Sequence, residues 1–128
     1  MSIQLSDAIS AWTDAIGTEF VSVDAQSLKE RETATFQTHH KVAAILRPAS
    51  TEQVQQCVRI ANQFKTPIYS VSTGKNWGYG SSAPSSDCTL IDLGRLDQII
   101  EYDKTLGYVV LEPGVTQWQL YEFLQSQG

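Results

Sequence analysis

The chain has 128 residues, enough for one domain with its own core, and its 41% hydrophobic and 18% charged content are those of a globular protein. The formal net charge of -5, with nine scattered Lys and Arg residues, argues against nucleic acid or an anionic membrane surface as partner. No apolar run is long enough for a bilayer span or a secretory signal, and Met1-Ser2-Ile3-Gln4 has no basic segment. We therefore predict a cytoplasmic protein.

The first forty residues predict little regular structure beyond one helix. Residues 6–17 have apolar side chains at helical spacing, with a serine as N-cap and a glycine as stop: Ile9, Trp12, Ile16, Ser6 and Gly17. Residues 18–40 are charge-rich, with a helical turn or two indicated at 28–32. We interpret residues 1–40 as a peripheral N-terminal lead-in segment and residues 41–128 as the organised domain.

The organised part begins with a strand, a helix and a second strand. Residues 42–46 are a continuous apolar run, which indicates a strand buried on both faces. Ser50 and Gln53 have capping-box spacing, so a helix should follow and run through Lys65. Residues 68–71 restart a strand. Strand, helix and strand with short joins predict a βαβ unit with a right-handed crossover.

Three further strands and a helix are expected after that unit. Residues 89–93 predict one strand, and residues 96–102 and 108–112 predict a hairpin with a turn of about five residues. Thr116 and Gln119 form a second capping-box pattern, which predicts a helix to the end of the chain.

The cysteines and histidines do not predict a metal site. Cys57 and Cys88 make no metal-binding spacing with each other or with the His39-His40 pair. Cys57 falls on the apolar face of the predicted helix, so we interpret it as a small buried hydrophobic residue, with a disulfide or reactive role as the alternative. We interpret the two histidines as solvated or locally hydrogen-bonded.

A glycine-rich stretch, residues 72–80, follows the second strand. Three glycines within seven positions allow backbone N–H groups to converge on one point, which can hold a phosphate without a basic patch. The spacing matches neither a P-loop nor a dinucleotide fingerprint, and the alternative is an ordinary polar loop. The candidate binding residues are Ser72, Thr73, Gly74, Lys75, Asn76, Trp77, Gly78, Tyr79 and Gly80.

Four ordered blocks carry a resemblance to a known family. They are Arg47-Pro48-Ala49-Ser50, Pro67 before the second strand, the glycine-rich stretch, and Leu111-Glu112-Pro113-Gly114-Val115-Thr116. Together, over residues 41–128, they resemble the first part of the PCMH-type FAD-binding domain of the 4-cresol dehydrogenase and vanillyl-alcohol oxidase family. The resemblance implies an α+β fold, with an N-terminal βαβ subdomain, the start of a second, mixed-sheet subdomain, and a domain incomplete at its C-terminus.

The resemblance also implies FAD as cofactor and a role for particular residues. Residues 72–80 would hold the FAD diphosphate, and the cofactor wall would come from Pro113, Gly114 and Val115. Tyr79 stands where the phenol-oxidising branch binds the substrate phenolate, so it is the candidate catalytic residue. Asn76 stands where berberine-bridge-type oxidases have a histidine bonded to the flavin, so no covalent link is expected at that position.

The function implied is that of an FAD-dependent oxidoreductase. It would oxidise a small molecule, a 4-alkylphenol, aromatic alcohol or other alcohol, by hydride transfer to flavin N5, and this part of the chain alone would be inactive. The alternatives are a catalytically inactive α/β binding module and a truncated gene product. The sequence leaves open the exact substrate, the electron acceptor and whether the protein is a homo-oligomer.

Overall fold

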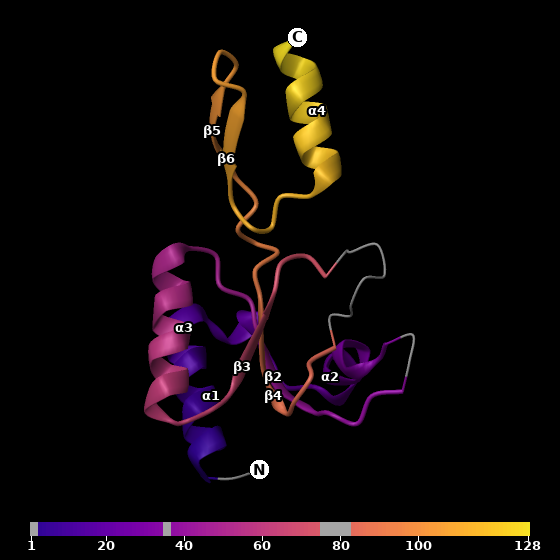
Figure 1. Ribbon diagram of the computed structural model, residues 1–128. Coiled ribbons are helices and arrows are strands. Elements are labelled where there is room, and N and C mark those ends of the chain that lie inside the picture. The colour runs from indigo at the N-terminus through magenta and orange to yellow at the C-terminus, as the bar shows by residue number, and fades with distance from the viewer. Residues whose placement is uncertain (1–2, 35–36, 75–82) are drawn as a thin grey trace.

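The structure, a computed structural model, describes residues 3–34, 37–74 and 83–128. Figure 1 shows helices packed around the main sheet, and a hairpin with the C-terminal helix beyond the end of that sheet. The predicted α+β architecture is confirmed. In chain order the elements are α1 (Ile3–Ile16), the 3-10 helix η1 (Thr18–Phe20), β1 (Val21–Ser22), α2 (Ala25–Glu32), β2 (Val42–Leu46), α3 (Thr51–Gln63), β3 (Ile68–Val71), β4 (Cys88–Asp92), β5 (Ile99–Asp103), β6 (Tyr108–Leu111) and α4 (Gln117–Gln127).

The main sheet has the strand order β1-β2-β4-β3. Strands β2, β4 and β3 are parallel, and β1 pairs antiparallel with β2. The predicted βαβ unit is present as β2, α3 and β3, but β4 lies between its two strands. All five residues of β4 are buried, as expected for a strand with neighbours on both edges and helices over its faces.

Both helix starts predicted from capping-box spacing are confirmed, with one difference in detail. The Thr116 side chain accepts from the Gln119 amide at 3.2 Å and the Gln119 side chain accepts from the Thr116 amide at 2.8 Å, which completes the capping box of α4. At α3 the Ser50 hydroxyl accepts from the Gln53 amide at 3.2 Å. The Gln53 side chain, however, accepts from the amide of Ala49 at 2.7 Å, one residue before the cap.

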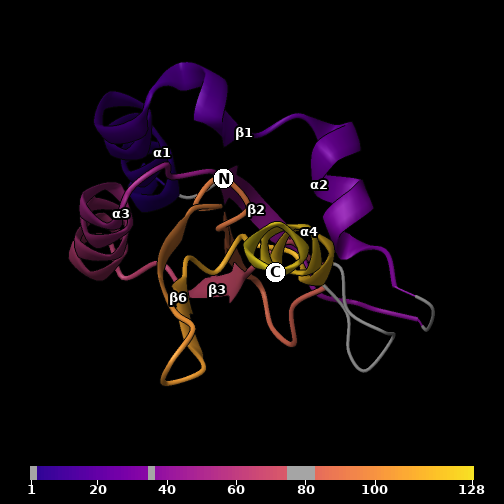
Figure 2. The same ribbon diagram turned by 90° about the horizontal axis from the view of Figure 1, so that it is seen from above.

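Helix α1 belongs to the core, so the interpretation of it as peripheral was wrong. It begins at Ile3, ahead of the predicted Ser6, and ends before Gly17, whose φ of 96° suits a glycine. Trp12 is fully buried, and its indole N–H donates to the carbonyl of Cys57 in α3 at 3.0 Å. Both helices carry apolar stripes, and the stripe of each helix is buried against the other helix. Figure 2 shows the two helices side by side.

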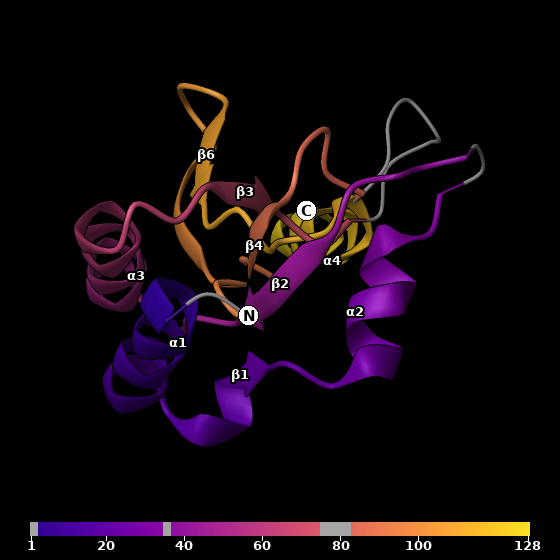
Figure 3. The ribbon, with the colours of Figure 1, turned by 90° about the horizontal axis from the view of Figure 1, so that it is seen from below.

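Helix α2 covers the opposite side of the sheet from α1 and α3 (Figure 3). Its side chain Leu28 packs with Val42, Ile45 and Leu90, the buried residues of the second apolar cluster. The sequence indicated only the second half of this helix, and it gave no sign of β1. A strand of two residues is too short to show a period, and α2 has mostly polar side chains.

A buried carboxylate joins the end of α2 to the start of β2. Glu32 is 8% exposed, and its two oxygens accept from the Lys41 ammonium and from the Val42 amide, each at 3.0 Å. Burial raises the pKa of Glu32, but these two hydrogen bonds and the Lys41 charge outweigh it and hold the pKa below its ordinary value of 4.5.

The Glu32 carboxylate makes stability depend on acidity. Since its pKa is lower in the folded chain than in the unfolded one, its stabilisation is complete above the unfolded value of 4.5 and is lost as the pH falls through the folded value. Lys41→Met should raise the pKa of Glu32 and lower the free energy of unfolding at neutral pH by about 1 kcal/mol. Urea unfolding at several pH values measures both, with Lys65→Met, just after the end of α3, as control. Equal losses in the two variants would contradict the assignment.

The burial of Cys57 agrees with its interpretation as a small buried hydrophobic residue, and His39 and His40 are exposed, which agrees with solvated side chains. Cys57 and Cys88 are free and buried, and burial raises the pKa of each thiol to about 11. His40 Nδ1 lies 3.7 Å from the Asp87 carboxylate. Within residues 3–34, 37–74 and 83–128 no group of three His, Cys, Asp or Glu side chains is placed to hold a metal ion. In the same ranges no helix is both long and apolar enough to span a bilayer.

Candidate functional site

The carboxyl ends of the three parallel strands point toward the hairpin and α4 (Figure 1). Strand β2 leads into Arg47, β3 into Ser72, and β4 into Leu93. In open α/β sheets ligands bind beyond such ends, because the loops that leave them converge there. The predicted site is therefore expected at this edge.

The start of the glycine-rich stretch lies at this edge. The Val71 carbonyl accepts from the Leu93 amide at 2.9 Å, so the chain leaves β3 directly beside the end of β4. The Ser72 hydroxyl accepts from the Thr73 amide at 2.6 Å. Gly74 has φ of 71°, a left-handed conformation that a glycine adopts without strain. The remaining predicted residues lie outside the described residues: Lys75, Asn76, Trp77, Gly78, Tyr79 and Gly80.

The second predicted block, Pro113 to Val115, packs against the connection from β4 to β5. The Gly114 amide donates to the Leu96 carbonyl at 2.7 Å. A Cβ added to Gly114 would lie 2.5, 2.7 and 2.9 Å from the carbonyl oxygens of Leu96, Leu93 and Gly94. A side chain does not fit there, so the close approach of the two backbones requires glycine.

The two predicted blocks therefore share one neighbour, the turn of residues 93–96 after β4. On one side, the carbonyls of the turn contact Gly114. On the other side, the Ser72 carbonyl oxygen lies 3.9 Å from the position that a Cβ on Gly94 would take. Sequence reasoning did not single out this turn or Asp92 before it. A usable signal was present, because Asp92 is an acid at the end of an otherwise apolar strand and precedes a Leu-Gly pair.

The arginines near this edge are engaged with other parts of the chain. Arg47 donates to the Ser22 hydroxyl at 2.7 Å, and Arg95 donates to the Arg47 carbonyl at 2.8 Å. Arg31 pairs with the Asp92 carboxylate. Of the groups that the structure describes at this edge, an anion would thus meet mainly backbone N–H groups and hydroxyls. The left-handed Gly74 allows backbone N–H groups to turn toward a ligand, whereas the cradle around Gly114 is filled by the turn of residues 93–96.

The comparison with known families identifies the family of the chain. A family described as the FAD binding domain matches residues 42–128. The chain belongs to this family. The predicted PCMH-type FAD-binding domain is confirmed, and its cofactor is FAD.

The relatives of this FAD-binding domain are longer proteins. The chain is 45% identical over 125 residues to 1'-carboxy-chondrochloren decarboxylase of Chondromyces crocatus, and the alignment covers 97% of this chain and 23% of that protein. It is 40% identical over 90 residues to the flavoprotein subunit of the hydroxylating 4-cresol dehydrogenase of Pseudomonas putida, covering 70% and 17%. The solved 4-ethylphenol oxidase of Gulosibacter chungangensis in complex with isoeugenol superposes with a TM-score of 0.89 at 38% identity, covering 100% and 25%.

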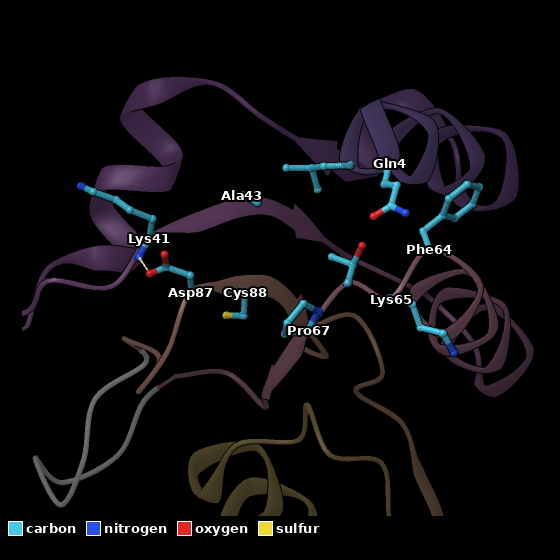
Figure 4. Close-up of a pocket in the computed structure, with 10 residues that line it drawn as sticks. Gln4, Lys41, Ala43, Phe64, Lys65, Pro67, Asp87 and Cys88 are labelled. Atoms are coloured by element: carbon cyan, nitrogen blue, oxygen red, sulfur yellow. Dashed lines mark hydrogen bonds between the residues drawn. The ribbon is translucent and has the colours of Figure 1, made fainter. Parts of the chain in front are cut away.

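The FAD-binding domain also has a pocket of about 330 Å³ at the other end of the sheet. Figure 4 shows it between the first turn of α1 and the residues that follow α3, with Lys41, Asp87 and Pro67 at the amino ends of the strands. The Lys41 amide donates to the Asp87 carboxylate at 2.8 Å there. Among the residues that the structure describes, none predicted to bind the cofactor is part of the pocket lining.

The cradle around Gly114 predicts that no side chain is tolerated at this position. Gly114→Ala should lower the free energy of unfolding by about 3 kcal/mol, because three backbone carbonyls must move to admit a methyl group. Gly107→Ala is the matched control, since Gly107 has φ of 69° and open space around it. Its cost should be about 1 kcal/mol, from the left-handed backbone alone. Urea unfolding of both variants is the measurement, and equal losses would mean that Gly114 is not sterically confined.

Proposed function

We propose that this FAD-binding domain is part of an oxidoreductase that takes a hydride from a para-substituted phenol or another alcohol. The observation that carries the proposal is the shared edge of the sheet, where Ser72 to Gly74 and Gly114 meet the turn after β4. The chain spans about a quarter or less of its relatives' length. The activity is therefore proposed for the complete protein.

Residues 72–80 are proposed to hold the FAD diphosphate through backbone N–H groups, with Pro113, Gly114 and Val115 as a wall of the site. Neutral N–H dipoles hold an anion without a basic surface, in keeping with the net charge of -5. When bound, FAD supplies a hydride acceptor at N5. We also propose residues 41–128 as the cofactor-binding unit and residues 1–40 as the segment that completes its core.

The proposed substrate class is supported by the phenols in the names of two relatives, 4-cresol and 4-ethylphenol. In this proposal Tyr79 donates its hydroxyl hydrogen bond to the phenolate oxygen of the substrate. A hydride, with the electron pair of its C–H bond, would leave the carbon atom attached to the para position for the acceptor that FAD supplies, and the phenolate would become a neutral quinone methide. A donor to that oxygen favours the phenolate, which is the ionised form that can release the hydride, and removal of such a donor typically costs about 10²-fold in rate or more.

The competing function is a catalytically inactive binding module on the same scaffold. The relative with 45% identity is a decarboxylase by name, so members that share this domain differ in the reaction they are named for. Absorbance separates the two functions at once. A yellow complete protein with flavin absorbance supports the oxidoreductase, whereas a colourless folded protein that takes up no added FAD supports the binding module.

The substrate class is tested by anaerobic bleaching of the flavin in the complete protein. We expect 4-cresol or vanillyl alcohol to bleach the wild type, and Tyr79→Phe to slow bleaching by about 10²-fold because the phenolate loses a donor. Tyr108→Phe is the control, because the Tyr108 hydroxyl donates to Glu101 within the hairpin, and it should bleach at the wild-type rate. Equal rates in wild type and Tyr79→Phe would exclude the role of Tyr79. Reduction by an aliphatic alcohol but by neither phenol would exclude the substrate class.

The role of the glycine-rich stretch is tested by affinity for FAD. Gly74→Val should raise the Kd of the complete protein for FAD by about tenfold or more, since a β-branched residue does not tolerate the left-handed backbone. Gly107→Val carries the same backbone strain in the exposed hairpin turn and should leave the Kd unchanged. Fluorescence titration of the apoprotein with FAD measures both. A Kd that rises equally in the two variants would point to general destabilisation instead.

A further inference from the structure

An ion pair connects the N-terminal helix α2 to the proposed cofactor edge. Arg31 and Asp92 are 61 residues apart in sequence, and the Arg31 guanidinium donates to Asp92 Oδ2. Their side chains are 23% and 11% exposed, so the pair is largely shielded from water. Arg31 precedes the residues 42–128 that match the family. The pair therefore brings a residue from outside the matched region to the end of β4.

The second oxygen of the same carboxylate holds the turn. Asp92 Oδ1 accepts from the Gly94 amide at 2.9 Å. A carboxylate held at both oxygens cannot rotate without losing one of these bonds. Arg31 thereby fixes the orientation in which Asp92 caps Gly94.

The turn held in this way touches both parts of the proposed site. The Leu93 amide donates to Val71 at 2.9 Å and the Leu96 amide donates to Leu93 at 3.0 Å. The carbonyls of Leu93, Gly94 and Leu96 form the cradle of Gly114. A shift of the turn would thus move the start of the glycine-rich stretch and the Gly114 wall relative to each other.

We propose that Arg31 is a positioning residue for FAD, acting through Asp92 on the turn of residues 93–96. The inference rests on the proposed function, because it takes this edge as the cofactor site. Arg31 itself need not touch FAD. Its contribution is to keep the two backbone segments at the spacing that the cofactor requires.

A second ion pair of α2 offers a matched control. Glu32, next to Arg31 in sequence, pairs with Lys41 at 3.0 Å. That pair lies at the amino end of β2, on the opposite edge of the sheet from the turn. Breaking either pair removes one cation and one contact of the same helix with the sheet, but only the Arg31 pair reaches the cofactor edge.

The experiment titrates the apo form of the complete protein with FAD and follows flavin fluorescence, alongside thermal unfolding of each apoprotein. Arg31→Met should raise the Kd for FAD by about tenfold, within the range for residues that act without touching the ligand. Lys41→Met should lower the unfolding temperature and leave the Kd within about twofold. Asp92→Asn should also raise the Kd by about threefold or more. The new amide nitrogen would either face the Arg31 guanidinium or replace the oxygen that accepts from the Gly94 amide, and in both orientations one bond is lost.

The Asp92→Asn variant separates positioning from charge. It removes a negative charge near a bound anion, so a purely electrostatic effect would lower the Kd, whereas positioning raises it. If Arg31→Met does not accumulate as folded protein, Asp92→Asn decides alone. A wild-type Kd in Arg31→Met, or a lower Kd in Asp92→Asn, would overturn the inference and leave the proposed function standing. Failure of the wild-type apoprotein to bind FAD would overturn the proposed function, and the inference with it.

Discussion

The close backbone approach at Gly114 is the contact on which the position of the loop before α4, relative to the main sheet, depends. Three carbonyl oxygens of the turn after β4 lie where a side chain would be, and that of Leu96 accepts a hydrogen bond from the Gly114 amide. This contact joins the loop before α4 to the central strand of the main sheet. Because β4 is buried along its whole length and paired on both edges, the turn that leaves it has a rigid base. The edge that is proposed to bind the cofactor is therefore held in position by the core.

The sequence predicted the elements whose signals are local. The apolar run of β2, the N-caps of α3 and α4, and the burial of Cys57 all follow from neighbouring residues or from helical spacing. It failed where partners are far apart. Trp12 was recognised as apolar, but its burial against Cys57 depends on a helix 45 residues away. The position of β4 between β2 and β3 is likewise a property of the assembled sheet, which periodicity within one strand does not encode.

The candidate site shows the same division. The glycines at 74 and 114 could be singled out from sequence, and the family resemblance placed them near one cofactor. The physical link between them, the turn of residues 93–96, was missed, because its importance comes from backbone atoms of ordinary residues. Asp92 was visible as an acid in an apolar strand, yet its partner Arg31 lies in a segment that pattern alone had set aside as a lead-in. Long-range ion pairs of this kind have no spacing rule to reveal them.

Electrostatics explains why such supports matter at this edge. The chain is acidic, and Arg31, Arg47 and Arg95 are each engaged with protein groups. A cation attracts a phosphate over several ångströms and tolerates small errors in position, whereas a backbone N–H must be aimed at the oxygen that it binds. A site proposed to rely on N–H groups is accordingly sensitive to the spacing of the segments that carry them. In such a site the residues that hold the backbone in place contribute to affinity as directly as the residues that contact the ligand.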